Sequence, residues 1–389
     1  MRKKVPNGDY KLHHKDPRIM VQVEPGQVGD YINLGSEGID NDGDGRINED
    51  GPGGYDANRD WPSEWQPNYV QGGAYNYPLH LPESKAVADF IKSHPNIAGV
   101  QSYHNSGGMI LRGPGIKDKG DFPSSDIRVY DYLGEEGEKM LPFYRYIVIW
   151  KDLYTVWGGF LDWTFKMEGI FTFSNEIFSS SQYYNKTVDR RSRDRSESEM
   201  ERLKFNDYLE FGDMFVDWKP YNHPVYGEIE IGGWKKLSRR VNPLFLLEET
   251  CHRNTAFTLF HAEQMPLLKL EKVETEKIDK DVYKINVSIR NERIIPSVAA
   301  HAANKNLHRG DIAKIEGNNI EILLAGIVQN KWTGEIDAID KRPQRILLKN
   351  GISGNSTKII QWIVKGRGKV NISFDSLKGG KLFKSFELK

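Results

Sequence analysis

The apolar residues in the first part of the chain follow strand-like and helix-like patterns in alternation. Ile97–Tyr103 is a short apolar run after a proline, and Gly169–Phe173 has the same character, so both predict buried strands. Residues 125–140, which lie between them, have the pattern of a helix. Alternation of strands and helices favours an α/β fold with an open mixed sheet flanked by helices.

Two further helices are predicted on either side of these elements. The string Leu81-Pro82-Glu83 begins one of them, because a proline and an acidic residue suit the first turn of a helix. Val87, Phe90 and Ile91 are then expected to form its apolar stripe. The other helix is long and apolar and runs from Asn242-Pro243 to about His261.

The pattern changes after a boundary at residues 264–266. Apolar and polar residues alternate over 283–289 and 370–374, and 359–364 is another strand candidate. Turn residues separate these runs, which is typical of antiparallel strands. We therefore expect a small antiparallel β-sandwich over 264–389, after an α/β domain over 1–263. The sandwich contains no candidate catalytic cluster.

Two segments of the first domain differ from the rest. The first 55 residues are rich in Gly, Asp, Asn and Pro and read as loops with short strands. Lys186–Lys204 carries dense mixed charge, which favours a solvated surface helix or insertion. We assign this run to a charged insertion over 180–240.

Composition excludes several classes of protein. The hydrophobic share of 38% suffices for a packed core. Lys and Arg together number 54, as do Asp and Glu, so nothing in the charge balance indicates nucleic acid or an anionic membrane as a partner. Cys251 is the single cysteine, so no internal disulfide can form. No apolar run approaches the roughly 20 residues that span a bilayer.

Oxygen-bearing side chains recur in the glycine-rich loop 40–51. Acidic residues at alternate positions followed by a glycine are typical of a calcium loop, although Gly51 stands where a bidentate acid is usual. The alternative is an acidic turn that holds no ion. The predicted ligands of a structural calcium ion are Asp40, Asp42, Asp44, Asn48 and Asp50.

Four residues form the candidate catalytic set. Asn58-Arg59 offers a fork of donors for a carboxylate, although a surface arginine in a loop is the alternative. His104 follows a buried strand, where an open α/β sheet places its ligands, and histidine is a preferred zinc ligand. Glu176 comes just after the second strand and is suited to be a general base. Tyr154 can donate a hydrogen bond to a substrate.

In order and spacing these elements resemble the carboxypeptidase A family of zinc metallopeptidases. The matching strings are residues 55–61, His104 at a strand end, Tyr154 eight residues before Asp162-Trp163, and residues 171–176. Tyr154 precedes Glu176 by 22 residues, as the corresponding residues do in the family. The resemblance covers roughly residues 1–262.

The resemblance implies a role for each candidate. Asn58 and Arg59 would bind the terminal carboxylate of the substrate, and His104 would be the third zinc ligand. Tyr154 would close over the substrate, and Glu176 would be the general base. Leu161 falls where the family lines its specificity pocket, and an apolar residue there favours apolar or aromatic C-terminal side chains.

The chain departs from the family in its metal ligands. The family takes its first two zinc ligands from a His-x-x-Glu motif upstream of the Asn-Arg pair, and no such motif precedes Asn58. The string His80-Leu81-Pro82-Glu83 matches by letters but follows the pair and begins a helix, so we treat it as a chance match. The oxyanion-stabilising arginine of the family would be Arg2 or Arg18, and the sequence does not decide between them.

Two explanations of this departure are open. The chain is the later part of a longer protein that supplies the two ligands and a signal peptide, or it is a natural chain that binds peptides without hydrolysing them. The first explanation predicts that the isolated chain is poorly stable, because the missing strands would expose sheet edges and apolar faces. It also predicts an inactive chain, because catalytic zinc sites use three protein ligands.

The leading functional hypothesis is a secreted or periplasmic zinc metallocarboxypeptidase that removes C-terminal residues from peptides. The alternatives are an amide deacylase on the same scaffold and a non-catalytic relic that binds peptides or glycans. The expected partner is a peptide or peptide-like substrate with a free C-terminal carboxylate, since Arg59 indicates one.

Overall fold

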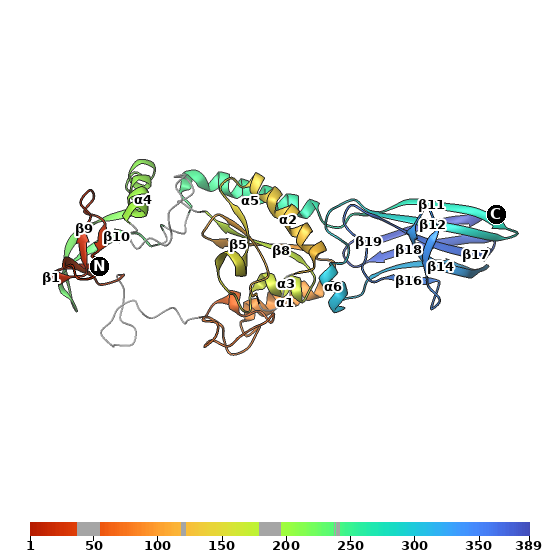
Figure 1. The fold of residues 1–389 in the computed structure, drawn as a ribbon, viewed down its shortest axis with the longest axis horizontal. Helices are drawn as coiled ribbons and strands as arrows, with labels where there is room; N and C mark the ends of the chain where they lie inside the picture. The colour runs from red at the N-terminus through yellow and green to blue at the C-terminus, as the bar shows by residue number, and fades with distance from the viewer. Residues whose placement is uncertain (37–54, 118–121, 179–195, 237, 239–241) are drawn as a thin grey trace. The chain divides into compact units, whose positions relative to one another are not determined.

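The computed structural model describes residues 1–36, 55–117, 122–178, 196–236, 238 and 242–389 (Figure 1). The predicted calcium loop over 40–51, with all five of its predicted ligands, lies outside these residues. The chain divides into two compact units. The first unit comprises Met1–Tyr55, Tyr103–Met109 and Glu176–His252, and the second comprises Asp56–Ser102, Ile110–Asn175 and Arg253–Lys389.

The first unit contains a six-stranded sheet and the helix α4 (Ser196–Leu209). The strand order is β3-β2-β4-β1-β10-β9. The strand β1, near the start of the chain, therefore pairs with β10, which lies more than 200 residues later. Arg2 pairs in register with Glu230 across the β1–β10 junction. The strands are β1 (Arg2–Gly8), β2 (Tyr10–Leu12), β3 (Met20–Gln22), β4 (Gly29–Asn33), β9 (Phe215–His223) and β10 (Gly227–Trp234).

Both candidate oxyanion arginines are held by ion pairs within this unit. Arg2 is buried, bonds to Glu230 at 2.5 Å, and places its guanidinium 4.3 Å from the ring centre of Trp218. Arg18 bonds to both Asp16 and Asp207 at 2.7 Å. Each guanidinium therefore has a structural role in the sheet, and neither is supported as an oxyanion-binding group.

Most of an α/β layer around a four-stranded sheet of order β5-β8-β6-β7 belongs to the second unit, although the ends of β5 and β8 and the beginning of α5 are counted in the first. The predicted strands and helices are present, with small shifts of their ends. The elements are α1 (Pro82–Ser93), β5 (Gly99–Asn105), β6 (Met109–Arg112), α2 (Ser124–Met140), β7 (Arg145–Val148), α3 (Phe160–Lys166), β8 (Phe171–Ile177) and α5 (Leu244–Glu263). Across the described residues, no helix is long and apolar enough to cross a membrane.

The core of this layer is aromatic. Tyr130, Phe165, Phe171, Phe173 and Phe257 are almost wholly buried and come from α2, α3, β8 and α5. The rings of Tyr130 and Phe173 meet edge to face with centroids 5.2 Å apart, a preferred aromatic geometry. Truncation of one such ring to alanine typically costs about 3–5 kcal/mol, so this cluster fixes the three helices against the sheet.

The predicted apolar stripe of α1 is wrong at two of its three positions. Val87 and Phe90 are 44% and 59% exposed, and only Ile91 is buried. The buried face instead consists of Ser84, Ala88 and Ile91, which recur at helical spacing. Small residues allow the helix to lie close to its neighbours, and the larger apolar side chains remain outside.

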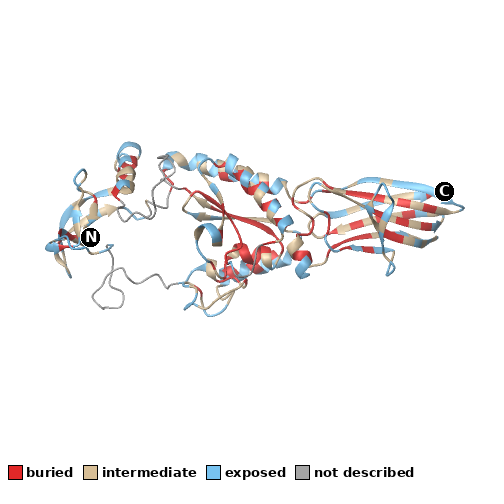
Figure 2. Cartoon of the chain, in the orientation of Figure 1, coloured by how far each residue is buried: buried red, intermediate tan, exposed pale blue. Residues whose placement is uncertain are grey.

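The C-terminal region contains two antiparallel sheets, of orders β11-β12-β17-β14-β15 and β16-β13-β18-β19. Their inward side chains form one buried core, visible as inner red stripes in Figure 2. The predicted alternation is confirmed, since Ile285, Trp362 and Ile372 are all fully buried. The strands are β11 (Leu268–Asp279), β12 (Val282–Asn291), β13 (Asp311–Gly317), β14 (Ile320–Asn330), β15 (Glu335–Ala338), β16 (Arg345–Leu348), β17 (Thr357–Gly366), β18 (Gly368–Ser376) and β19 (Gly380–Leu388).

A short helix, α6 (Ala300–Lys305), joins this region to the α/β layer. The buried carboxylate of Asp126 in α2 accepts hydrogen bonds from the amides of Ala300 and His301, at 3.0 and 2.8 Å. Ala302 also belongs to the aromatic core cluster. The predicted domain boundary between residues 263 and 264 stays a prediction.

His261 of α5 makes the stability of this layer depend on pH. Its side chain is buried, with Nδ1 3.2 Å from the amide nitrogen of Gln101, and burial lowers its pKa to about 4. The unfolded chain takes up this proton near pH 6.5, whereas the folded chain resists it down to about pH 4. The free energy of unfolding should therefore fall by about 3 kcal/mol as the pH drops through this range.

Urea denaturation of the wild type and of His261→Gln, at pH 7 and pH 4.5, tests this expectation. The difference between the two proteins isolates His261 from the buried carboxylates, whose contributions change in the same range. The wild type should lose stability relative to the variant on acidification. A constant difference between them would contradict the assignment.

Candidate substrate-binding site

The Asn58-Arg59 pair lies in a single turn of helix, η1 (Ala57–Arg59), which precedes α1 in the chain. The carboxylate of Asp56 accepts the Asn58 amide at 2.8 Å and so caps this turn. The side-chain oxygen of Asn58 accepts the amide of Phe160, the first residue of α3, at 3.0 Å. The pair is thus attached to the beginning of α3, although the two are 102 residues apart.

The Arg59 guanidinium lies close to two oxygens of this turn. Its Nη1 donates to the carbonyl of Asn58 at 2.8 Å and lies 3.8 Å from the carboxylate of Asp56. The arginine side chain is 12% exposed. An arginine has five N–H donors, so these contacts leave capacity for a bidentate partner.

Asp60, the next residue, attaches the same turn to α1. Its carboxylate is buried, and its two oxygens accept the amides of His80 and Leu81, each at 3.1 Å. These amides belong to the two residues that directly precede α1, the second of which is its N-cap. The turn that carries Arg59 is therefore fixed to two helices.

Tyr154 directly follows the short helix η2 (Ile149–Leu153) and lies six residues before α3 in the chain. It is 58% exposed. Nearby, the amide of Val156 donates to the carbonyl of Gly115 at 2.8 Å, and the amide of Gly115 donates to the carboxylate of Asp162 at 2.9 Å. The segment that follows Tyr154 is thus held by α3 as well.

Gly158 brings this segment against the arginine turn. Its carbonyl accepts the amide of Trp61 at 3.1 Å, and its φ is +63°. A side-chain carbon at this position would lie 2.7 Å from the carbonyl oxygen of Arg59. Both the conformation and the close approach require glycine.

A buried group of charges stabilises α3 below these contacts. The Lys166 ammonium lies 3.2 Å from the carboxylate of Asp162 and 2.6 Å from that of Glu64. Burial raises the pKa of Asp162, and the charge of Lys166 opposes this effect. Leu161, next to this aspartate, is buried in α3.

Four of the predicted site residues lie in the same unit, on segments that contact α3 or belong to it. Asn58, Arg59, Tyr154 and Leu161 lie in the second unit and are joined through α3 by the contacts above. His104 and Glu176 belong to the first unit, at the ends of β5 and β8. Glu176 lies inside β8, not after it as predicted, and its carbonyl accepts the amide of Gly108 at 2.8 Å.

The described residues do not fit a catalytic zinc ion. Among them, no three His, Cys, Asp or Glu side chains are grouped closely enough to hold a metal. The chance match at 80–83 supplies no ligands either, because the ring of His80 packs on Tyr75 with centroids 3.9 Å apart, and Glu83 is exposed. We therefore derive no chemical step through zinc.

Sequence reasoning missed the residues that support the site. Lys166 and Glu64 were not singled out, and Asp60 and Asp162 entered only as parts of matching strings. The spacing of Asp162 and Lys166, four residues apart in a helix, was a usable signal for an ion pair. The partners of Asp60 are 20 and 21 residues away in a loop, and no periodic pattern indicates them.

We predict that Lys166→Met destabilises the protein by about 3 kcal/mol, because it leaves the buried carboxylate of Asp162 without its charged partner. Urea denaturation at pH 7 measures the change. Lys85→Met is the matched control, since Lys85 and Asp89 have the same spacing but are 61% and 63% exposed. An exposed pair contributes about 0–1 kcal/mol, so equal effects of the two substitutions would contradict the prediction.

Comparison with known families identifies two segments of the chain. Residues 34–189 match the family described as zinc carboxypeptidase. Residues 267–387 match a domain of unknown function (DUF8731). No curated protein matches the chain.

Among solved structures, the chain is similar to thrombin activatable fibrinolysis inhibitor, with 22% identity and a TM-score of 0.29 over 33% of this chain and 35% of that one. It is similar to carboxypeptidase A from Helicoverpa armigera, with 22% identity and a TM-score of 0.28 over 41% and 40% of the two chains. A β-glucosidase from Bifidobacterium adolescentis matches at 8% identity and a TM-score of 0.14, over 32% and 17%.

The chain thus spans between a third and two fifths of the length of the first two structures. TM-scores this low add nothing to the assignment, which depends on the family match. That match includes Asn58, Arg59, His104, Tyr154, Leu161 and Glu176. The resemblance to the zinc carboxypeptidase family that the sequence predicts is therefore confirmed for residues 34–189.

Proposed function

We propose that this chain binds peptides by their free C-terminal carboxylate, at the Asn58-Arg59 turn, as a protein of the metallocarboxypeptidase type. The family match supports a hydrolase that acts on peptides. The observation that carries the proposal is the double attachment of this turn, through Asn58 to α3 and through Asp60 to α1. A fixed guanidinium with spare donors is suited to hold a carboxylate in one orientation.

The environment of Arg59 favours such an ion pair. The side chain is only 12% exposed, so water screens its charge less than on an open surface. Asp56 is the nearest described carboxylate, and at 3.8 Å it is too far for a strong hydrogen bond. A substrate carboxylate would thus meet a guanidinium whose charge is only partly balanced.

Three further roles belong to the proposal. Tyr154 is exposed beside a fixed segment and is suited to donate a hydrogen bond to the bound peptide. Leu161 gives the beginning of α3 an apolar character that favours apolar or aromatic terminal side chains. Glu176 is the candidate general base for attack of water on the scissile carbonyl, and His104 the candidate metal ligand. We also propose a secreted or periplasmic location.

The prediction that tests carboxylate binding compares two peptides. A dansyl-labelled dipeptide with a free C-terminus should bind the full chain, and its C-terminally amidated analogue should bind about tenfold to a hundredfold more weakly. Arg59→Gln should remove this difference, because it removes the cation that recognises the free carboxylate. Fluorescence anisotropy measures both affinities.

Arg128→Gln provides the matched control. Arg128 is an exposed residue of α2, and its loss changes the net charge by the same amount. This variant should keep the wild-type preference for the free carboxylate. Equal binding of the two peptides by the wild type would refute carboxylate recognition, whatever the variants do.

A second candidate function is peptide binding without hydrolysis. The specific observation in its favour is that the described residues bring together no group of metal ligands. Under this alternative Glu176→Gln leaves the function unchanged, and the purified chain holds no stoichiometric zinc. Peptide release in the presence of added zinc, lost in Glu176→Gln, would instead establish hydrolysis.

A further inference from the structure

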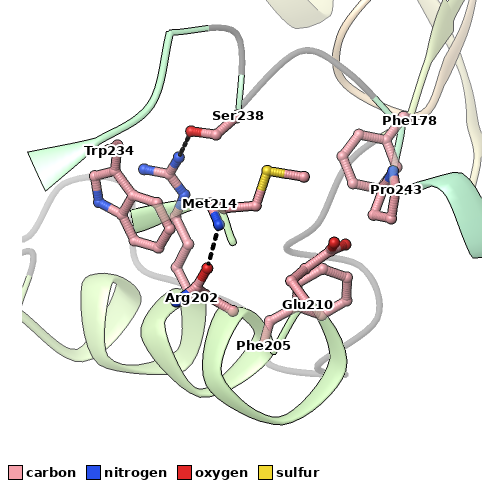
Figure 3. Close-up of a pocket in the computed structure, with 9 residues that line it drawn as sticks. Phe178, Arg202, Phe205, Glu210, Met214, Trp234, Ser238 and Pro243 are labelled. Carbon is pink, nitrogen blue, oxygen red and sulfur yellow. Dashed lines mark hydrogen bonds between the residues drawn. The ribbon is translucent and has the colours of Figure 1, made fainter. Parts of the chain in front are cut away.

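A pocket lies in the first unit, apart from the residues assigned to substrate binding in the second. Figure 3 shows it between the helix α4, the hairpin of β9 and β10, and the beginning of α5. Most of its walls are apolar. The lining residues are Phe178, Arg202, Phe205, Asn206, Glu210, Met214, Trp234, Ser238 and Pro243.

The carboxylate of Glu210 is the unusual feature of this pocket. Glu210 directly follows α4, and Figure 3 shows its carboxylate pointing toward Phe178 and Pro243. One of its oxygens, Oε1, is buried and has no hydrogen-bond partner in the described part of the chain. Burial, together with the nearby Asp213, raises the pKa of Glu210. A buried carboxylate oxygen without a partner is costly, so a cation that reached Oε1 would be bound favourably.

Arg202 does not neutralise this carboxylate. Its guanidinium lies 3.4 Å from the ring centre of Trp234, donates to the hydroxyl of Ser238 at 2.8 Å, and is 3.9 Å from Glu199. Among the described residues, no ion pair joins Arg202 to Glu210. Arg202 thus belongs to the wall formed with Trp234 and Ser238. The negative charge of Glu210 is not balanced by it.

We propose that this pocket binds the side-chain ammonium of a lysine presented by a polypeptide partner. The ammonium is a compact cation suited to a single carboxylate oxygen, whereas the fork of an arginine needs two. The apolar stem of a lysine would pack against Phe205, Met214 and Pro243, which line the approach to Glu210.

The surroundings of the pocket favour a polypeptide over a free amine. Leu209 and Phe211, which flank Glu210 in the chain, are 49% and 90% exposed. Leu244, next to Pro243, is 85% exposed, and the ring of Phe245 lies 6.3 Å from that of Phe205. Exposed apolar residues gathered around a pocket are typical of a protein-binding surface.

Isothermal titration of the full chain tests the proposal with blocked tripeptides. One peptide is acetylated, amidated, and has a lysine between two phenylalanines; the other has norleucine in place of lysine. The amidated end excludes recognition of a free carboxylate, so the result is independent of the proposed function. The lysine peptide should bind at least about tenfold more tightly than the norleucine peptide.

Glu210→Gln should abolish this preference without unfolding the chain, because it removes a carboxylate that has no described partner. Asp213→Asn is the matched control: Asp213 is 74% exposed, pairs with Lys235 at 2.7 Å, and loses the same charge. The control should keep the preference for lysine. Equal binding of the two tripeptides by the wild type, no binding of either, or an unchanged preference in Glu210→Gln would each overturn the proposal.

Discussion

The turn from Asp56 to Asp60 supplies hydrogen-bond acceptors to the first amide of α3 and to the two amides that precede α1. Asn58 satisfies the beginning of α3, and Asp60 satisfies the beginning of α1. Helix amides in these positions have no internal partner, so the loop becomes a structural part of both helices. Arg59 lies between the two capping residues. The backbone position of Arg59, the proposed binding residue, is therefore set by the same contacts.

Regular elements with long periodic patterns were the most predictable part of the fold. The helix expected over 125–140 is α2, and the inward residues of β12, β17 and β18 follow the predicted alternation. The stripe of α1 was predicted wrongly, because counting large apolar residues overlooked the small face of Ser84 and Ala88. A helix that packs closely on its neighbours buries small residues. The ring of Phe90 then stays outside the core, where it contacts His94 of the same chain segment.

The candidate site was predictable to a lesser degree. A matching string located Arg59 and Tyr154, but the contacts that position them depend on chain crossings that no local pattern encodes. Arg2 illustrates the difficulty: its partner Glu230 is 228 residues away and meets it only because β1 and β10 are adjacent. The C-terminal sheets were expected as a separate module. The structure packs α6 against the aromatic core, and Lys378 donates to the carbonyl of Gly169 across the same junction.

The close approach at Gly158 has an evolutionary consequence. Any side chain there would both strain the backbone and press on the carbonyl of Arg59. A lineage that keeps the arginine as a binding residue must also keep the glycine, while one that loses the function is free to change both. The pair should therefore vary together among descendants of this chain, even though Gly158 itself contacts no substrate. Its loss would mark a copy in which the proposed carboxylate site was given up before the arginine itself has changed.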